Sequence, residues 1–107
     1  MAEYVTVARI EDVPEGEVRA VEAGGRAIAL AHAGGRVYAV QGECAHMQGP
    51  LGEGRVDGCV LTCPWHGWQY DVRTGENEFD RAITIETFDV RVDDGEIQVA
   101  IGLHDGS

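Results

Sequence analysis

The sequence predicts an all-β fold, an antiparallel β-sandwich or small barrel, in a single domain that fills residues 1–107. Glycine accounts for 15 of the 107 residues, about twice the roughly 7% of an average protein. Many of these glycines stand in pairs or turn dipeptides. The segments between them alternate apolar and polar residues or are β-branched, and none repeats its apolar residues at helical spacing. Many short strands joined by tight turns are therefore expected.

The first half of the chain is predicted to be a meander of strands. Four strands are expected, at residues 4–9, 17–22, 26–33 and 36–41. A turn at 13–16, which contains proline and glycine, separates the first two strands. The pairs Gly24-Gly25 and Gly34-Gly35 flank the third strand, which predicts close hairpin turns at both of its ends.

The last part of the chain is predicted to be a hairpin that closes the sheet. Residues 87–92 and 96–101 alternate in hydrophobicity around the turn dipeptide Asp94-Gly95. Residues 42–70 do not follow the strand pattern. We therefore expect them to form a smaller, separate part of the domain.

The charge of the chain limits the kinds of partner it can bind. Eight basic residues, all of them arginine, stand against 19 carboxylates, and the formal net charge is −11. This charge would repel nucleic acid and anionic membranes, and it favours a protein with a basic patch. Solubility alone is the alternative explanation of the acidity.

The amino-terminal residues and the cysteines indicate a compartment. The amino terminus shows no export signal, and the longest purely apolar run, residues 27–31, is too short to cross a membrane. Three cysteines, an odd number, favour metal or redox chemistry over a disulfide framework. A cytoplasmic protein without a membrane anchor is expected.

Two short motifs within residues 42–70 carry residue types that can bind a metal. Cys44-Ala45-His46 is followed, after 16 residues, by Cys63-Pro64-Trp65-His66. Zinc would accept two cysteines and two histidines, but structural zinc sites usually place two or more residues between paired ligands. A 2Fe-2S cluster suits the set better if both cysteines bind one iron and both histidines bind the other. A structural zinc module for protein interaction remains the alternative.

At these residues the chain resembles the Rieske family, whose signature is C-x-H followed at about this distance by C-x-x-H. The flanking residues agree with the family: Gly49, Leu51, Gly67 to Asp71, and Thr74-Gly75. The resemblance implies a Rieske-like fold in which two loops of a cluster-binding subdomain, about residues 42–70, carry one 2Fe-2S cluster. It implies the ligands Cys44, His46, Cys63 and His66.

Within this family the sequence is similar to the soluble ferredoxins of aromatic ring-hydroxylating dioxygenase systems. Membrane-anchored relatives carry an additional cysteine in each loop, where this chain has Gly49 and Trp65. Oxygenase subunits continue into a long catalytic domain, whereas this chain ends at Ser107. The resemblance implies a carrier that takes one electron from a flavin-dependent ferredoxin reductase to a terminal oxygenase and turns over no substrate of its own. The small subunit of an assimilatory nitrite reductase is the alternative within the family.

Residues near the ligands are expected to tune and shield the cluster. High-potential relatives have a serine hydroxyl where this chain has Trp68, and a tyrosine hydroxyl at the position of Tyr70, so the resemblance implies a reduction potential in the lower part of the family's range. Tyr70 would donate to the sulfur of Cys44, or else be a core aromatic with its hydroxyl in water. Trp65 and Met47 would shield the cluster or form a docking patch.

Other residues near these motifs are given structural roles. Cys59 is expected to be a buried or half-buried free thiol. The crowded carboxylates of residues 76–86 are interpreted as a solvated face, with a basic partner as the alternative. Residues 77–83 lack the proline-rich sequence that covers the cluster in many relatives.

Overall fold

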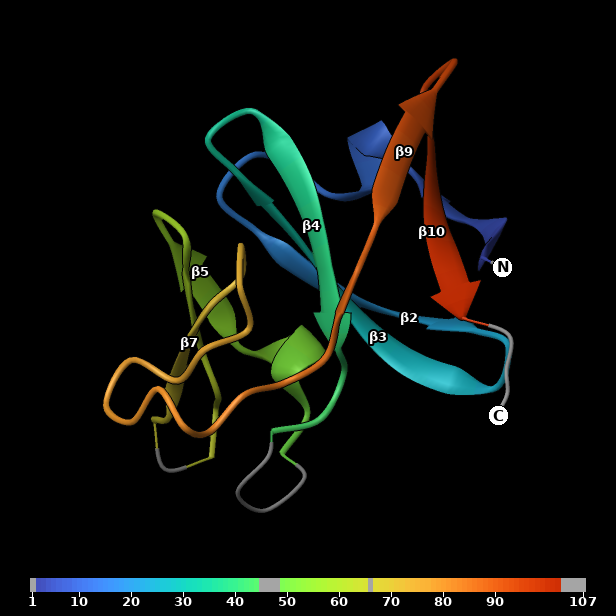
Figure 1. Cartoon of the computed structure of the whole chain (residues 1–107). Coiled ribbons are helices and arrows are strands. Elements are labelled where there is room, and N and C mark those ends of the chain that lie inside the picture. The colour runs from blue at the N-terminus through green and yellow to red at the C-terminus, as the bar shows by residue number, and fades with distance from the viewer. Residues whose placement is uncertain (1, 45–48, 66, 103–107) are drawn as a thin grey trace.

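The structure is a computed structural model that describes residues 2–44, 49–65 and 67–102, and its strands form antiparallel sheets (Figure 1). The strands of the described residues are β1 (Ala2–Arg9), β2 (Val18–Ala23), β3 (Arg26–Ala33), β4 (Arg36–Gln41), β5 (Arg55–Asp57), β6 (Val60–Thr62), β7 (Gln69–Asp71), β8 (Thr87–Phe88), β9 (Val90–Asp93) and β10 (Glu96–Gly102). The same part of the chain contains two single 3₁₀ turns, η1 (Ile10–Asp12) and η2 (Leu51–Glu53). The predicted all-β class is confirmed.

The strands of the described residues form three sheets. The central sheet has the order β2-β3-β4-β8, a second sheet has the order β1-β10-β9, and a small third sheet has the order β5-β6-β7. All pairs within them are antiparallel. In Figure 1, β4 lies between the β9–β10 hairpin on one side and β5 and β7 on the other.

The central sheet separates two hydrophobic cores because β3 is buried on both faces. Ile28 and Leu30 pack in one core with Ile97 and Val99 of β10. The alternate residues of β3, exemplified by Ala29, pack in the other core, which contains the third sheet. Since successive side chains of a strand point to opposite faces, one strand anchors both outer sheets.

Most of the predicted strands are confirmed, and two details differ. The third and fourth predicted strands coincide with β3 and β4. The strand predicted at residues 87–92 is split into β8 and β9 at Asp89. The third sheet was not predicted, because its first two strands, within residues 55–62, have only three residues each and turn at Gly58. Gly58 has φ 62°, a conformation in which glycine is unstrained.

Among the described residues, no helix has the length and the apolar character that a membrane span requires.

Candidate metal centre

Each metal-binding motif begins at the closed base of a loop. In the first loop, the N–H of Cys44 donates to Gly49 O at 2.8 Å, and the N–H of Leu51 donates to Gly42 O at 2.9 Å. In the second loop, the N–H of Cys63 donates to Trp68 O at 2.7 Å. These backbone bonds fix the two cysteines on neighbouring loop bases next to the third sheet.

The two predicted cysteine ligands are buried together. Cys44 is 3% exposed and Cys63 is 1% exposed, and both belong to the core that contains Leu61 and Tyr70. The loops are in direct contact, because a Cβ placed on Gly49 would lie 2.7 Å from Cys63 Sγ. Glycine at position 49 therefore leaves the space that the sulfur occupies.

Each sulfur has a hydrogen-bond donor within reach. The Tyr70 hydroxyl lies 3.1 Å from Cys44 Sγ, and it donates when Cys44 is a thiolate, because a thiolate can only accept. The backbone N–H of Trp65 donates to Cys63 Sγ at 3.4 Å. The predicted contact of Tyr70 with Cys44 is thus confirmed. The donor at Trp65 was missed, since any residue type can supply a backbone N–H.

The electrostatics of the thiols fit a metal site. Burial raises the pKa of the Cys63 thiol, the Trp65 N–H lowers it, and the adjacent Cys44 thiol raises it. Because burial and mutual repulsion disfavour two neighbouring thiolates, both thiols can ionise at neutral pH only when a cation compensates their charge. Iron in a 2Fe-2S cluster satisfies this requirement, and the sulfur-directed donors are those that such clusters use.

The other two predicted ligands, His46 and His66, lie outside the described residues, as does Met47. Within the described part, no third cysteine, histidine or carboxylate joins the two thiols in a metal-binding group. The assignment of His46 and His66 as ligands remains a prediction.

Three residues outside the predicted ligand set differ in burial and bonding. Cys59 is a half-buried free thiol. His32 donates from Nδ1 to Val13 O at 2.7 Å, while its Nε2 lies 3.4 Å from a carboxylate oxygen of Glu15. Trp65 is 48% exposed, and the choice between a shielding and a docking role for it stays open.

Asn77 organises the loop that follows β7, a role that was not predicted. Its side chain is 2% exposed, and Oδ1 accepts the N–H groups of Phe79 at 2.8 Å and Asp80 at 3.0 Å. The N–H of Asn77 donates to Ile83 O at 2.9 Å. An Asx turn thus orders the segment in which many relatives have proline. The signal for it is the asparagine itself, which favours turns of this kind.

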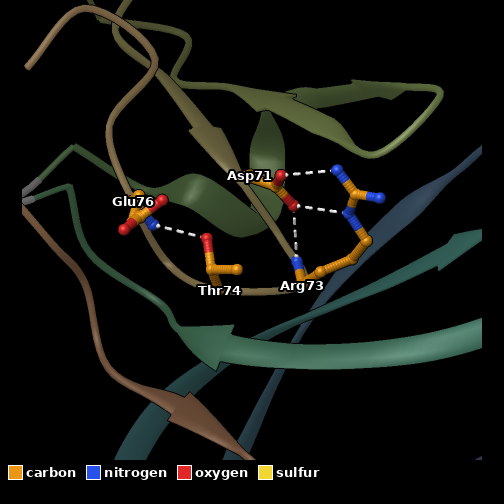
Figure 2. Close-up of polar contacts among 4 residues, drawn as sticks. All are labelled: Asp71, Arg73, Thr74 and Glu76. Carbon is orange, nitrogen blue, oxygen red and sulfur yellow. Dashed lines mark hydrogen bonds and ion pairs between the residues drawn. The ribbon is translucent and has the colours of Figure 1, made fainter. Parts of the chain in front are cut away.

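A tight turn joins β7 to this loop (Figure 2). Asp71 Oδ1 accepts the Arg73 backbone N–H at 2.8 Å and Nε at 3.0 Å, and Oδ2 accepts Nη2 at 2.8 Å. The Thr74 hydroxyl accepts the Glu76 N–H at 3.2 Å. The bonded Arg73 guanidinium lowers the pKa of the Asp71 carboxyl below its usual value.

Replacing Asp71 by asparagine should reduce the free energy of unfolding at pH 7 by up to about 1 kcal/mol, because Arg73 is exposed and the pair is screened. Since folding lowers the pKa of Asp71, its stabilisation is complete above the carboxyl's ordinary pKa and is lost as pH falls through the folded value. Urea unfolding of both proteins from pH 7 to pH 3 should show the difference shrinking in acid. A difference that grew in acid would contradict this.

Known proteins resemble the chain over almost its whole length. The ferredoxin subunit of anthranilate 1,2-dioxygenase from Burkholderia cepacia is 34% identical over 105 residues, which cover 95% of each chain. The solved complex of reduced oxygenase and oxidized ferredoxin in carbazole 1,9a-dioxygenase contains a chain that is 32% identical, with a TM-score of 0.82 and coverage of 91% of this chain and 92% of that one.

A solved structure of lower sequence identity shares the fold. A chain from Mycobacterium tuberculosis, described as the small subunit of an NADH-dependent nitrite reductase, has a TM-score of 0.88 over 97% of this chain and 99% of its own length. Its identity is 20%, so this likeness shows the fold alone.

The family itself is identified by a match that includes both metal-binding motifs. The profile of the Rieske [2Fe-2S] domain matches residues 3–89, which contain both loops and all four predicted ligands. The buried thiol pair and its hydrogen-bond donors fit the cofactor of that family. The chain therefore belongs to the Rieske [2Fe-2S] domain family, and its cofactor is a single Rieske 2Fe-2S cluster.

Proposed function

We propose that this chain is a one-electron carrier of an oxygenase system and has no catalytic turnover of its own. The observation that supports this proposal most strongly is the buried pair of Cys44 and Cys63, with a hydrogen-bond donor directed at each sulfur, in a chain of the Rieske family. Residues 1–107 act as one domain, and residues 42–70 are its cluster-binding part.

In this proposal Cys44 and Cys63 hold one iron, and His46 and His66 hold the other. When bound, the cluster supplies a one-electron couple whose potential depends on hydrogen bonds to sulfur and on burial. The Tyr70 hydroxyl and the Trp65 N–H place partial positive charge at the thiolates, which favours the reduced form. Leu51 and Leu61, both fully buried, help to exclude water from the sulfurs.

The partners are a flavin-dependent ferredoxin reductase, which supplies the electron, and a terminal oxygenase, which accepts it. The proposal is supported by the similarity to a ferredoxin subunit of anthranilate 1,2-dioxygenase and to a chain from a solved oxygenase–ferredoxin complex. The aromatic substrates named for such systems belong to the oxygenases. The cytoplasm is the proposed location, because Cys59, the described cysteine that this proposal does not assign to iron, is a free thiol.

Metal analysis with electron paramagnetic resonance tests the proposal. Anaerobically purified protein should contain two irons and two acid-labile sulfides per chain, the content of one 2Fe-2S cluster. After dithionite reduction it should give a rhombic signal whose average g value lies below that of clusters with only cysteine ligands. One zinc per chain, with no sulfide and no signal, would overturn the proposal.

Replacing Tyr70 by phenylalanine should lower the reduction potential by roughly 50 mV, since a hydrogen bond to a thiolate contributes about 1 kcal/mol more in the reduced state. The matched control is Tyr38→Phe, at a half-buried tyrosine that packs against the same core. Spectroscopic redox titration of the three proteins measures the effect. Equal potentials for wild type and Tyr70→Phe would show that the hydroxyl does not tune the cluster.

A further inference from the structure

Phe79 is an exposed aromatic residue in the loop ordered by Asn77. Its side chain is 74% exposed, which makes it the most exposed large apolar residue of the described part of the chain. An exposed phenylalanine contributes nothing to the core and costs solubility. A side chain of this kind is common at the centre of protein interfaces, where it is buried by the partner.

The loop around Phe79 is held in one conformation. The buried Asn77 accepts the N–H of Phe79, and the N–H of Ile83 donates to Asp80 O at 3.0 Å. Asp80 Oδ1 accepts the N–H of Ala82 at 3.0 Å. Because the backbone is already ordered, a partner that binds Phe79 would lose little affinity to ordering it.

The same loop is attached beside the second metal-binding loop. The N–H of Glu78 donates to Gln69 O at 2.8 Å, and the preceding carbonyl, Trp68 O, accepts the N–H of Cys63. The carbonyl of Trp68 therefore binds the base of the Cys63 loop, and the carbonyl of the next residue, Gln69, binds the loop that carries Phe79. In Figure 1 the segment after β7 lies along the β5–β7 side of the molecule, opposite the β9–β10 hairpin.

Carboxylates flank the phenylalanine. Glu78 and Asp80 are both exposed, one on each side of Phe79, and Glu76 is half-buried nearby in sequence. Arg81 is the one basic residue among residues 76–81, so this stretch is net acidic like the chain as a whole. The partner surface that complements it is apolar at its centre and basic at its rim.

We propose that Glu78, Phe79 and Asp80 form a docking knob that inserts into a basic-rimmed apolar recess on an electron-transfer partner protein. The proposal rests on the proposed carrier function. Burial of Phe79 stabilises the complex, and the two carboxylates steer its formation. Because these three residues lie beside the Cys63 loop, a partner bound to them lies near the part of the molecule that carries the cluster.

Stopped-flow reduction of oxidised mitochondrial cytochrome c, a basic protein, by the reduced holoprotein tests the knob. Phe79→Ala should lower the second-order rate constant about tenfold at every salt concentration, since it removes an interface anchor. Phe79→Leu should recover part of the rate. Glu78→Gln/Asp80→Asn should lower the rate several-fold at low salt and flatten its dependence on ionic strength. The control Val92→Thr changes an apolar side chain that is 47% exposed on β9, in another sheet, and should have no effect.

Iron, sulfide and reduction potential are measured on every variant before the kinetics. Full clusters with unchanged potentials, together with a slow Phe79→Ala variant, would support the knob. Full clusters with Phe79→Ala as fast as Val92→Thr at all salt concentrations would overturn the knob and leave the carrier function intact. A wild-type protein without a reducible cluster would overturn both, because the docking proposal depends on the carrier.

Discussion

Replacement of Cys63 by alanine is expected to give a colourless protein without iron or sulfide. Cys63 Sγ is buried, accepts the Trp65 N–H, and lies against the backbone of Gly49 in the opposite loop. No other described thiol can take its place, because Cys44 already occupies the neighbouring position and Cys59 lies in the turn between β5 and β6. Cys44→Ala should have the same result. Iron and sulfide assays on purified protein measure both.

Cys59→Ala is the matched control, since it removes the third thiol of the chain. Cys59 is half-buried and packs at the margin of the core that contains Cys44 and Cys63. The control should keep two irons and two sulfides per chain, the content of one 2Fe-2S cluster. A Cys63→Ala protein with full iron, or a Cys59→Ala protein without it, would show that the ligand assignment is wrong.

Gly54→Ala is expected to have the largest effect on stability. A Cβ on Gly54 would lie 2.0 Å from Thr62 O and 3.3 Å from Leu51 O. Both contacts are with backbone atoms, which cannot rotate away, so β5 and β6 must separate where Arg55 pairs with Thr62. Overpacking of this kind should lower the free energy of unfolding by about 3 kcal/mol. Thr62 precedes Cys63, so we also expect fewer iron atoms per chain in this variant.

Gly58→Ala separates crowding from backbone strain. Gly58 has φ +62° in the turn of the same hairpin, but a Cβ there would meet nothing within 4 Å. Gly58→Ala should lower the free energy of unfolding by about 1 kcal/mol, the strain of an alanine in the left-handed conformation. It should keep its full iron content. Thermal and urea unfolding of the two variants compare them. Equal losses of unfolding free energy in Gly54→Ala and Gly58→Ala would contradict the crowding at Gly54.

The strands were predictable where glycine turns delimit them. The ranges 26–33 and 36–41 were correct because a glycine pair separates them, and Gly34 and Gly35 both have positive φ. The β5–β6 hairpin was missed although Asp57-Gly58 is a typical turn dipeptide. Its strands have three residues each, too few to show alternation. The break at Asp89 was also not predictable, because it arises where the chain passes from β8, which pairs with β4 in one sheet, to β9, which pairs with β10 in another.

The two cysteines of the predicted site lie close together, their role as ligands stays a prediction, and the surroundings of the site were only partly predicted. Cys44 and Cys63 lie together as their motifs predicted, and Tyr70 reaches the Cys44 sulfur. The N–H of Trp65 and the space left by Gly49 depend on how two loops meet. The hydrogen-bonded turn at Asn77 was not predicted, because it depends on the burial of that side chain.

The sequence by itself determined the cofactor, since the kind of metal centre follows from which cysteines and histidines the chain offers and at what spacing. It also determined the all-β class, since glycine turns and alternation are local. Only the tertiary structure decided that Tyr70, 26 residues from Cys44, supplies a donor to its sulfur, and that Phe79 is directed to solvent. These features depend on packing between segments far apart in the chain, and local sequence patterns do not reveal such packing.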